Sequence, residues 1–240
     1  MTFLVYYPII KHQQFHTKSL RMPNHKDLPL NHIFIPAKVP SPKLMIILHG
    51  RGDSSNGFSF LPPYLNIDDM NYILLDAPFD YYGGFSWYDL PPNQLEGIAY
   101  SSAILADVLD TLFEEEFNAE ESFLFGFSQG ALLTFEFGAR YEKVLAGYIA
   151  VSGYIYDADN LLQEMNQEVK TSHWLCTHGT YDDVLPFSTS KAQVETLQNG
   201  GFDITFKSYE KTHTIAEDEL QMLAEWIKGS SNNRHLVIHV

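Results

Sequence analysis

One serine in this chain lies in a pattern that suits a nucleophile. Ser128 is the centre of Gly126-Phe127-Ser128-Gln129-Gly130, the Gly-x-Ser-x-Gly pattern of a sharp turn from a strand into a helix. Such a turn gives the serine a strained backbone with positive φ, where flanking side chains would clash, so glycines suit the flanking positions. The N-terminus of the following helix favours the negative charge that develops during acyl transfer. The motif therefore predicts a serine exposed for covalent catalysis.

The context of the motif is more informative than the motif alone. A match arises by chance in about one chain in twenty of this length and composition. Here a strand-like run (SFLFGF) leads directly into it and a helical run (ALLTFEFGARY) follows it. The alternative is an inert serine in a tight turn between strand and helix. The two flanking patterns favour the nucleophile.

A second glycine-rich turn offers hydrogen-bond donors for the charge on a reacting carbonyl. The sequence LHGRG (48–52) follows the run KLMIIL, which is expected to be a strand buried on both faces. Backbone N–H groups in such a turn can form an oxyanion hole. We assign the two donors to Arg51 and to Gln129, the residue after the serine. His49 precedes Ser128 in the chain and is expected to hold the turn by hydrogen bonding rather than act as a base.

A serine nucleophile also needs a base and an acid. Hydrolases with this type of turn carry them in the order serine, aspartate or glutamate, histidine. The loop after the strand-like run HWLCT contains Asp182 and Asp183, and we prefer Asp182 on spacing alone. His178, in the same loop, is expected to be structural. His213 lies between the last strand and the closing helix, where its imidazole could take the Ser128 proton while the acid holds the other ring nitrogen.

The rest of the chain alternates strand-like and helical segments, which is typical of an α/β fold with a largely parallel sheet. Strands are expected over residues 32–35, 43–48, 72–75, 122–127, 144–151, 173–177 and 202–209, and helices over 98–113, 131–141 and 217–228. Residues 229–233 are expected to be a flexible linker to a β-rich tail. The sequence thus predicts one domain over residues 1–229, including an N-terminal extension (1–30) of uncertain structure, and a tail over 230–240.

Composition excludes several classes of function. The formal charge is −15, from 30 acidic and 15 basic residues, and it repels the phosphates of nucleic acids and of anionic membranes. The apolar residues 1–10 lack a basic segment and a cleavage site and are too short to span a bilayer. A single cysteine, Cys176, excludes an intrachain disulfide and points to a reducing compartment. We expect a cytoplasmic protein without stable membrane insertion or nucleic-acid binding.

Aromatic and proline-rich segments flank both glycine-rich turns and could form the wall of an apolar pocket. In the second segment, YYGGFSWYDLPP (81–92), Phe85, Trp87 and Tyr88 are the candidates to line a substrate pocket beside Ser128. The alternative is ordinary packing of this segment onto the core.

These pieces together resemble the carboxylesterase, lysophospholipase and acyl-protein thioesterase family of small α/β-hydrolases. The pieces follow the family's order between about residues 30 and 228, and they are LHGRGD (48–53), DAP (76–78), SWYDL (86–90), GFSQG (126–130), SGY (152–154), HGTYDDVLP (178–186) and the His213 loop. The resemblance implies an α/β-hydrolase fold, with a mostly parallel central sheet flanked by helices. It also implies a triad of Ser128, Asp182 and His213, an oxyanion hole at Arg51 and Gln129, and no metal or organic cofactor.

Three features depart from the family's pattern. Ala131 stands where members often carry a second glycine after the serine turn. Lys211 and Thr212 stand where a glycine commonly precedes the base. Arg51 replaces a residue that is often apolar. None of these changes removes a catalytic group, and Arg51 leaves the substrate preference open.

The predicted function is a serine hydrolase that cleaves small or lipid-like carboxylic esters or thioesters through an acyl-serine intermediate. One alternative is a peptidase or amidase on the same scaffold, although such peptidases usually bring extra domains. Another is a non-catalytic binding module, because a fold does not fix a function. The complete set of serine, aspartate and histidine argues against that reading. A β-rich tail could pair with the sheet edge of a second copy, so a homodimer is a further hypothesis.

Overall fold

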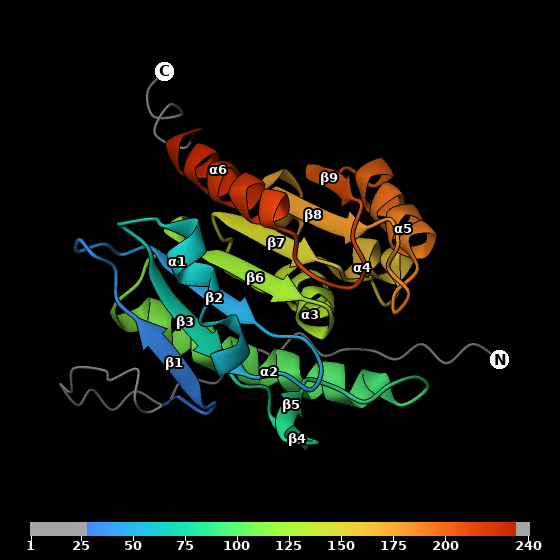
Figure 1. The fold of residues 1–240 in the computed structure, drawn as a ribbon, viewed down its shortest axis with the longest axis horizontal. Coiled ribbons are helices and arrows are strands. Elements are labelled where there is room, and N and C mark those ends of the chain that lie inside the picture. The colour runs from blue at the N-terminus through green and yellow to red at the C-terminus, as the bar shows by residue number, and fades with distance from the viewer. Residues whose placement is uncertain (1–27, 234–240) are drawn as a thin grey trace.

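The computed structural model describes residues 28–233, which form a seven-stranded sheet with helices on both faces (Figure 1). The strands lie in the order β1-β3-β2-β6-β7-β8-β9, with β1 antiparallel to β3 and every other pairing parallel. Their bounds are β1 His32–Ile35, β2 Leu44–Leu48, β3 Asn71–Leu75, β6 Phe123–Phe127, β7 Gly147–Val151, β8 His173–Gly179 and β9 Ile204–Tyr209. A separate hairpin consists of β4 (Phe79–Tyr81) and β5 (Gly84–Ser86).

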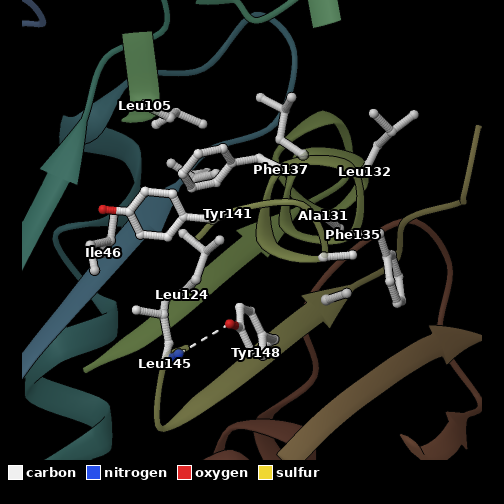
Figure 2. Close-up of a cluster of buried hydrophobic side chains, with 14 of the residues drawn as sticks. Ile46, Leu105, Leu124, Ala131, Leu132, Phe135, Phe137, Tyr141, Leu145 and Tyr148 are labelled. Carbon is white, nitrogen blue, oxygen red and sulfur yellow. Dashed lines mark hydrogen bonds between the residues drawn. The ribbon is translucent and has the colours of Figure 1, made fainter. Parts of the chain in front are cut away.

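The helices cover the sheet because its strands are apolar on both faces. They are α1 Leu61–Leu65, α2 Gln94–Glu115, α3 Gln129–Gly138, α4 Ala158–Glu164, α5 Phe187–Asn199 and α6 Glu217–Asn233. Side chains alternate between the faces of a strand, so Ile46 of β2 packs in one core with α2 and α3, and Ile47 packs in the other with α1 and α6. Figure 2 shows part of the first core, which contains Ile46, Leu105, Tyr141 and the aromatic side chains of α3 and β7. Each such buried aliphatic side chain contributes about 1.5–3 kcal/mol.

The predicted α/β fold and its mostly parallel sheet are confirmed. All seven predicted strands are present within a few residues of their expected bounds, and the three predicted helices correspond to α2, α3 and α6. The hairpin β4–β5 and the helices α1, α4 and α5 were not predicted. No helix within residues 28–233 is long and apolar enough to cross a membrane.

The predicted linker at the C-terminal end of the domain is wrong. Residues 229–233 continue α6 as regular helix. Glycine, serine and asparagine are weak helix formers, but Leu223, Ile227 and Ser230 repeat at helical spacing and are all buried. Tertiary packing therefore extends the helix beyond the point where propensity alone would end it. The predicted β-rich tail after Asn233, and residues 1–27 of the N-terminal extension, lie outside the described residues.

Candidate active site

Ser128 occupies a sharp turn between β6 and α3. Its backbone has φ 54° and ψ −112°, the positive φ that the motif predicts. A Cβ on Gly126 would lie 2.1 Å from the carbonyl oxygen of Gly130, and a Cβ on Gly130 would lie 2.3 Å from that of Leu48. Both glycines are thus required because other backbone passes so close to them. The turn leaves the Ser128 side chain partly exposed.

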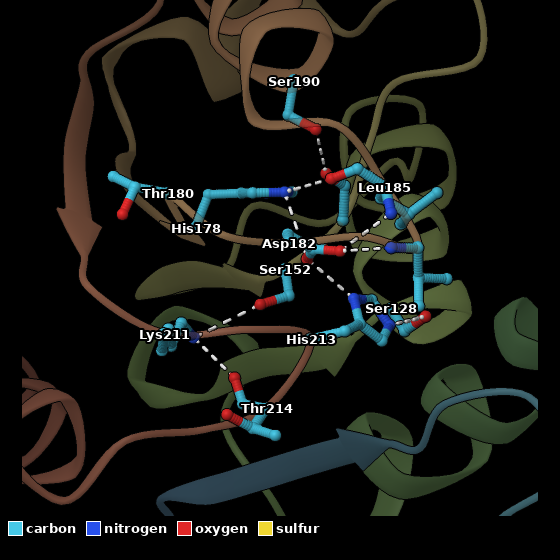
Figure 3. A network of polar contacts seen from close by, with 12 residues as sticks. Ser128, Ser152, His178, Thr180, Asp182, Leu185, Ser190, Lys211, His213 and Thr214 are labelled. Carbon is cyan, nitrogen blue, oxygen red and sulfur yellow. Dashed lines mark hydrogen bonds and ion pairs between the residues drawn. The ribbon is translucent and has the colours of Figure 1, made fainter.

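Three residues far apart in the chain form a continuous line of hydrogen bonds (Figure 3). The Oγ of Ser128 lies 2.9 Å from Nε2 of His213, and Nδ1 of His213 lies 2.8 Å from Oδ2 of Asp182. The three residues follow β6, β9 and β8. Because these strands are parallel, their carboxyl ends share one edge of the sheet, and the loops after them meet there.

The Asp182 carboxylate is buried and held by four donors. Its Oδ1 accepts the backbone N–H of Leu185 at 2.8 Å and of Val184 at 3.0 Å, while Oδ2 faces His213 and, at 3.3 Å, Nε2 of His178. Burial alone would raise the pKa of Asp182, but the hydrogen bonds from Leu185, His213 and Val184 outweigh it, and the pKa lies below its ordinary value. This carboxylate is therefore charged at neutral pH.

The neighbouring acid occupies a different environment. Asp183 is exposed, and no hydrogen bond or ion pair described for residues 28–233 involves its carboxylate. Of the two acids that the sequence offered, the structure places only Asp182 against the imidazole of His213.

His178 contributes more to the site than its predicted structural role suggested. Its side chain is fully buried, and Nε2 lies 2.9 Å from the carbonyl oxygen of Leu185 as well as near Asp182. Burial lowers the pKa of His178, so the ring is neutral and its Nε2–H faces these two oxygens. His178 therefore holds the loop that carries Asp182 on the side opposite His213 (Figure 3). The sequence feature that could have indicated this contact is the position of His178 four residues before Asp182.

The glycine-rich turn after β2 lies against the serine. A Cβ on Gly50 would lie 3.3 Å from the Cβ of Ser128. Among the hydrogen bonds of the described residues, none uses the backbone N–H of Arg51 or of Gln129. Both donors are thus available to a ligand. His49 supports the turn, since its Nδ1 lies 2.6 Å from the Gly50 carbonyl and its Nε2 accepts the Ala77 N–H at 3.1 Å.

The predicted pocket residues divide into two groups. Phe85 is partly exposed, whereas Trp87 and Tyr88 are 0% and 1% exposed and belong to the core. The prediction that Trp87 and Tyr88 line an open pocket is wrong. Their segment packs beneath the turn instead, because the Trp87 indole donates to the His49 carbonyl at 2.9 Å and the Gln129 amide donates to the Tyr88 carbonyl at 2.7 Å.

A buried ion pair behind His213 was not predicted. Nζ of Lys211 lies 2.6 and 2.7 Å from the two carboxylate oxygens of Glu219, and the two side chains are 4% and 0% exposed. Nζ also lies 2.7 Å from the carbonyl oxygen of Thr214 and 3.2 Å from Oγ of Ser152 (Figure 3). Lys211 appeared in the sequence only as a departure from the family's pattern. Here it ties the loop that carries His213 to α6.

The substitution at Ala131 is matched by a glycine on a neighbouring loop. A Cβ on Gly153 would lie 2.4 Å from the Cβ of Ala131. The glycine of the SGY sequence thus leaves room for the methyl group that Ala131 adds after the serine turn.

Comparison with known proteins identifies the family. A model of the phospholipase/carboxylesterase family matches residues 31–231. The chain belongs to the phospholipase/carboxylesterase family. A curated member, acyl-protein thioesterase 1 of Kluyveromyces lactis, is 28% identical over 83% of this chain and 97% of its own length. Carboxylesterase SOBER1 of Arabidopsis thaliana is 28% identical over 77% of this chain and 91% of its own.

Solved structures of esterases share the fold. Esterase PE8 superposes with a TM-score of 0.76 at 26% identity, covering 83% of this chain and 98% of that one. The predicted family, the α/β-hydrolase fold and the class of enzyme, a hydrolase of esters or thioesters, are confirmed.

Proposed function

We propose that this protein hydrolyses carboxylic esters or thioesters through an acyl intermediate on Ser128. The observation that carries the proposal is the unbroken line of hydrogen bonds from Ser128 Oγ through His213 to Asp182, at 2.9 and 2.8 Å. A binding module would need none of this alignment. The named relatives support both substrate classes, because one is a thioesterase and another a carboxylesterase.

The proposed mechanism begins with proton transfer. Nε2 of His213 takes the Ser128 proton as Oγ attacks the substrate carbonyl, and the Asp182 carboxylate stabilises the imidazolium. The backbone N–H groups of Arg51 and Gln129 donate to the oxyanion of the tetrahedral intermediate. His213 then protonates the departing alcohol or thiol. A water molecule, deprotonated by His213, attacks the acyl carbon. The bond from this carbon to Ser128 Oγ then breaks, His213 returns the proton to Oγ, and the carboxylic acid is released.

Turnover of a graded series of substrates tests this proposal. We expect hydrolysis of 4-nitrophenyl acyl esters and of acyl thioesters, with weaker activity on the matching anilides, which report amidase activity. Ser128→Ala should lower kcat by about four to six orders of magnitude while the protein remains folded. Absence of ester and thioester turnover by the wild-type protein would refute the proposal. Faster cleavage of the anilides than of the esters would favour the amidase.

The cytoplasmic location and the homodimer are also proposals. The single cysteine, Cys176, is fully buried, and burial raises the pKa of its thiol to about 12, which suits a protein that forms no disulfide. Cell fractionation tests the location. Molar mass measured with and without residues 234–240, which follow α6, tests the dimer, because loss of the tail should give a monomer if the tail joins two copies.

A further inference from the structure

The guanidinium of Arg51 has no acidic partner within residues 28–233. None of the described hydrogen bonds or ion pairs involves it, and its Nε is buried without a partner. The closest acid in the sequence is Asp53, and its carboxylate points elsewhere. Its Oδ1 accepts the Ser54 N–H at 2.8 Å. The same oxygen packs against Gly57, where it would lie only 1.9 Å from an added Cβ. The chain carries 30 acidic and 15 basic residues, so an unpaired cation at this position is unexpected.

An aromatic platform fixes the direction of this side chain. Cζ of Arg51 lies 4.2 Å from the centre of the Tyr81 ring, in a cation–π contact. Tyr81 ends β4, and the hairpin is bonded to the same glycine-rich turn through Gly52 N–H to Phe85 O at 2.7 Å and Phe85 N–H to Asp53 O at 2.8 Å. The cation and its platform therefore form one unit, which is oriented before a ligand binds.

The same residue contacts the reacting carbonyl in the proposed mechanism. Its backbone N–H is one of the two unused donors, and the preceding residue, Gly50, packs against Ser128. Burial raises the pKa of the Tyr88 hydroxyl, and the positive charge of Arg51 opposes that rise. A substituent a few bonds from the substrate carbonyl would thus lie within reach of a cation that lacks a counterion.

We propose that Arg51 binds a carboxylate on the ester substrate, so that the site prefers anionic esters to neutral ones of the same size. A guanidinium binds a carboxylate through two parallel hydrogen bonds, and Arg51 has free N–H donors for this contact. This inference rests on the proposed function, because it assigns the substrate class of the same site.

Two pairs of substrates test the inference by kinetics. The first pair, 4-nitrophenyl butyrate and the 4-nitrophenyl monoester of glutaric acid, places the carboxylate on the acyl side. The second pair, phenyl butyrate and 4-carboxyphenyl butyrate, places it on the alcohol side. We expect kcat/KM of the wild-type protein to be about tenfold or more higher for the anionic member of one pair. That pair identifies the side on which Arg51 binds.

Variants assign the preference to Arg51. Arg51→Met should lower kcat/KM for the anionic ester about tenfold more than for the neutral one, and Arg51→Lys should keep part of the preference. Lys38→Met, at an exposed surface ion pair with Asp68, changes the net charge equally and should leave the ratio unaltered. A wild-type protein without preference in either pair would overturn the inference, as would equal losses for both esters in Arg51→Met.

A binding measurement separates this inference from the proposed function. In the Ser128→Ala background, calorimetric titration with both members of each pair measures affinity without turnover. We expect at least tenfold tighter binding of the anionic ester in the pair that wild-type kinetics identifies, and loss of this difference in Ser128→Ala/Arg51→Met. Equal affinities within both pairs for Ser128→Ala would refute the role of Arg51, whether or not the wild-type protein is an esterase.

Discussion

Gly179 and Lys211 bring two active-site loops into backbone contact. A Cβ on Gly179 would lie 2.3 Å from the carbonyl oxygen of Lys211, and the same oxygen accepts the Tyr181 N–H at 3.1 Å. Gly179 ends β8, just before Asp182, and Lys211 follows β9, just before His213. The acid and the base therefore meet because their loops join directly, with no side chain between them.

Replacement of this glycine should separate the two loops. We expect Gly179→Ala to lower the free energy of unfolding by about 1–3 kcal/mol, because backbone atoms must move to admit the methyl group. It should also lower kcat/KM at least tenfold, since a small displacement of His213 from Ser128 breaks their alignment. Chemical denaturation and ester kinetics measure the two effects.

Gly229→Ala is the matched control. This glycine lies within α6 and has no heavy atom near the position of an added Cβ, so the change should stabilise the protein by about 0.5–1 kcal/mol without altering kcat/KM. Unchanged activity and stability of Gly179→Ala would contradict the close contact between the loops.

Removal of one charge of the Lys211–Glu219 ion pair should destabilise the protein more than removal of both charges. Lys211→Met leaves the fully buried Glu219 carboxylate unpaired, and we expect a loss of about 3–5 kcal/mol in the free energy of unfolding. The double variant Lys211→Met/Glu219→Leu removes both charges and should recover most of that loss. Urea unfolding of the three proteins measures the coupling. A double variant no more stable than Lys211→Met would show that the charges are not paired in solution.

The two acids of the loop after β8 should differ sharply in catalysis. Asp182→Asn should lower kcat by about three to four orders of magnitude, because an amide no longer stabilises the imidazolium of His213. Asp183→Asn removes the same charge at an exposed position and should alter kcat less than twofold. Equal losses in the two variants would refute the assignment of Asp182.

Asp182 should also make stability depend on pH. The pKa of this carboxyl lies below its ordinary value of 3.8 in the folded protein, so the folded state favours the charged form. The charged carboxylate contributes its full stabilisation above pH 3.8, the ordinary pKa of the group. This contribution is lost as the pH falls through the lower pKa that Asp182 has in the folded protein. The difference in unfolding free energy between the wild-type protein and Asp182→Asn should therefore be constant from pH 5 to 7 and shrink below about pH 4. Urea unfolding across this range measures it, and a difference that grows on acidification would contradict the account.

The sequence predicted the parts of the molecule that have strong local signals. Apolar runs revealed the strands, and the glycines around Ser128 marked a turn whose positive φ and close backbone contacts the structure shows. Trp87 and Tyr88 were misjudged because an aromatic residue in a loop looks the same whether it lines a pocket or supports a turn from below. The Lys211–Glu219 pair depends on the packing of α6 against a distant loop, which residue types and spacing do not encode.

Covalent labelling tests the central claim most directly. The protein is incubated with a fluorophosphonate, which reacts with an activated serine, and the labelled peptide is identified by mass spectrometry. We predict one label per molecule, on Ser128, with no labelling of Ser128→Ala and a rate at least a hundredfold slower in His213→Gln, which lacks the base. Label on another residue, or an unreactive Ser128 in the folded wild-type protein, would contradict the account.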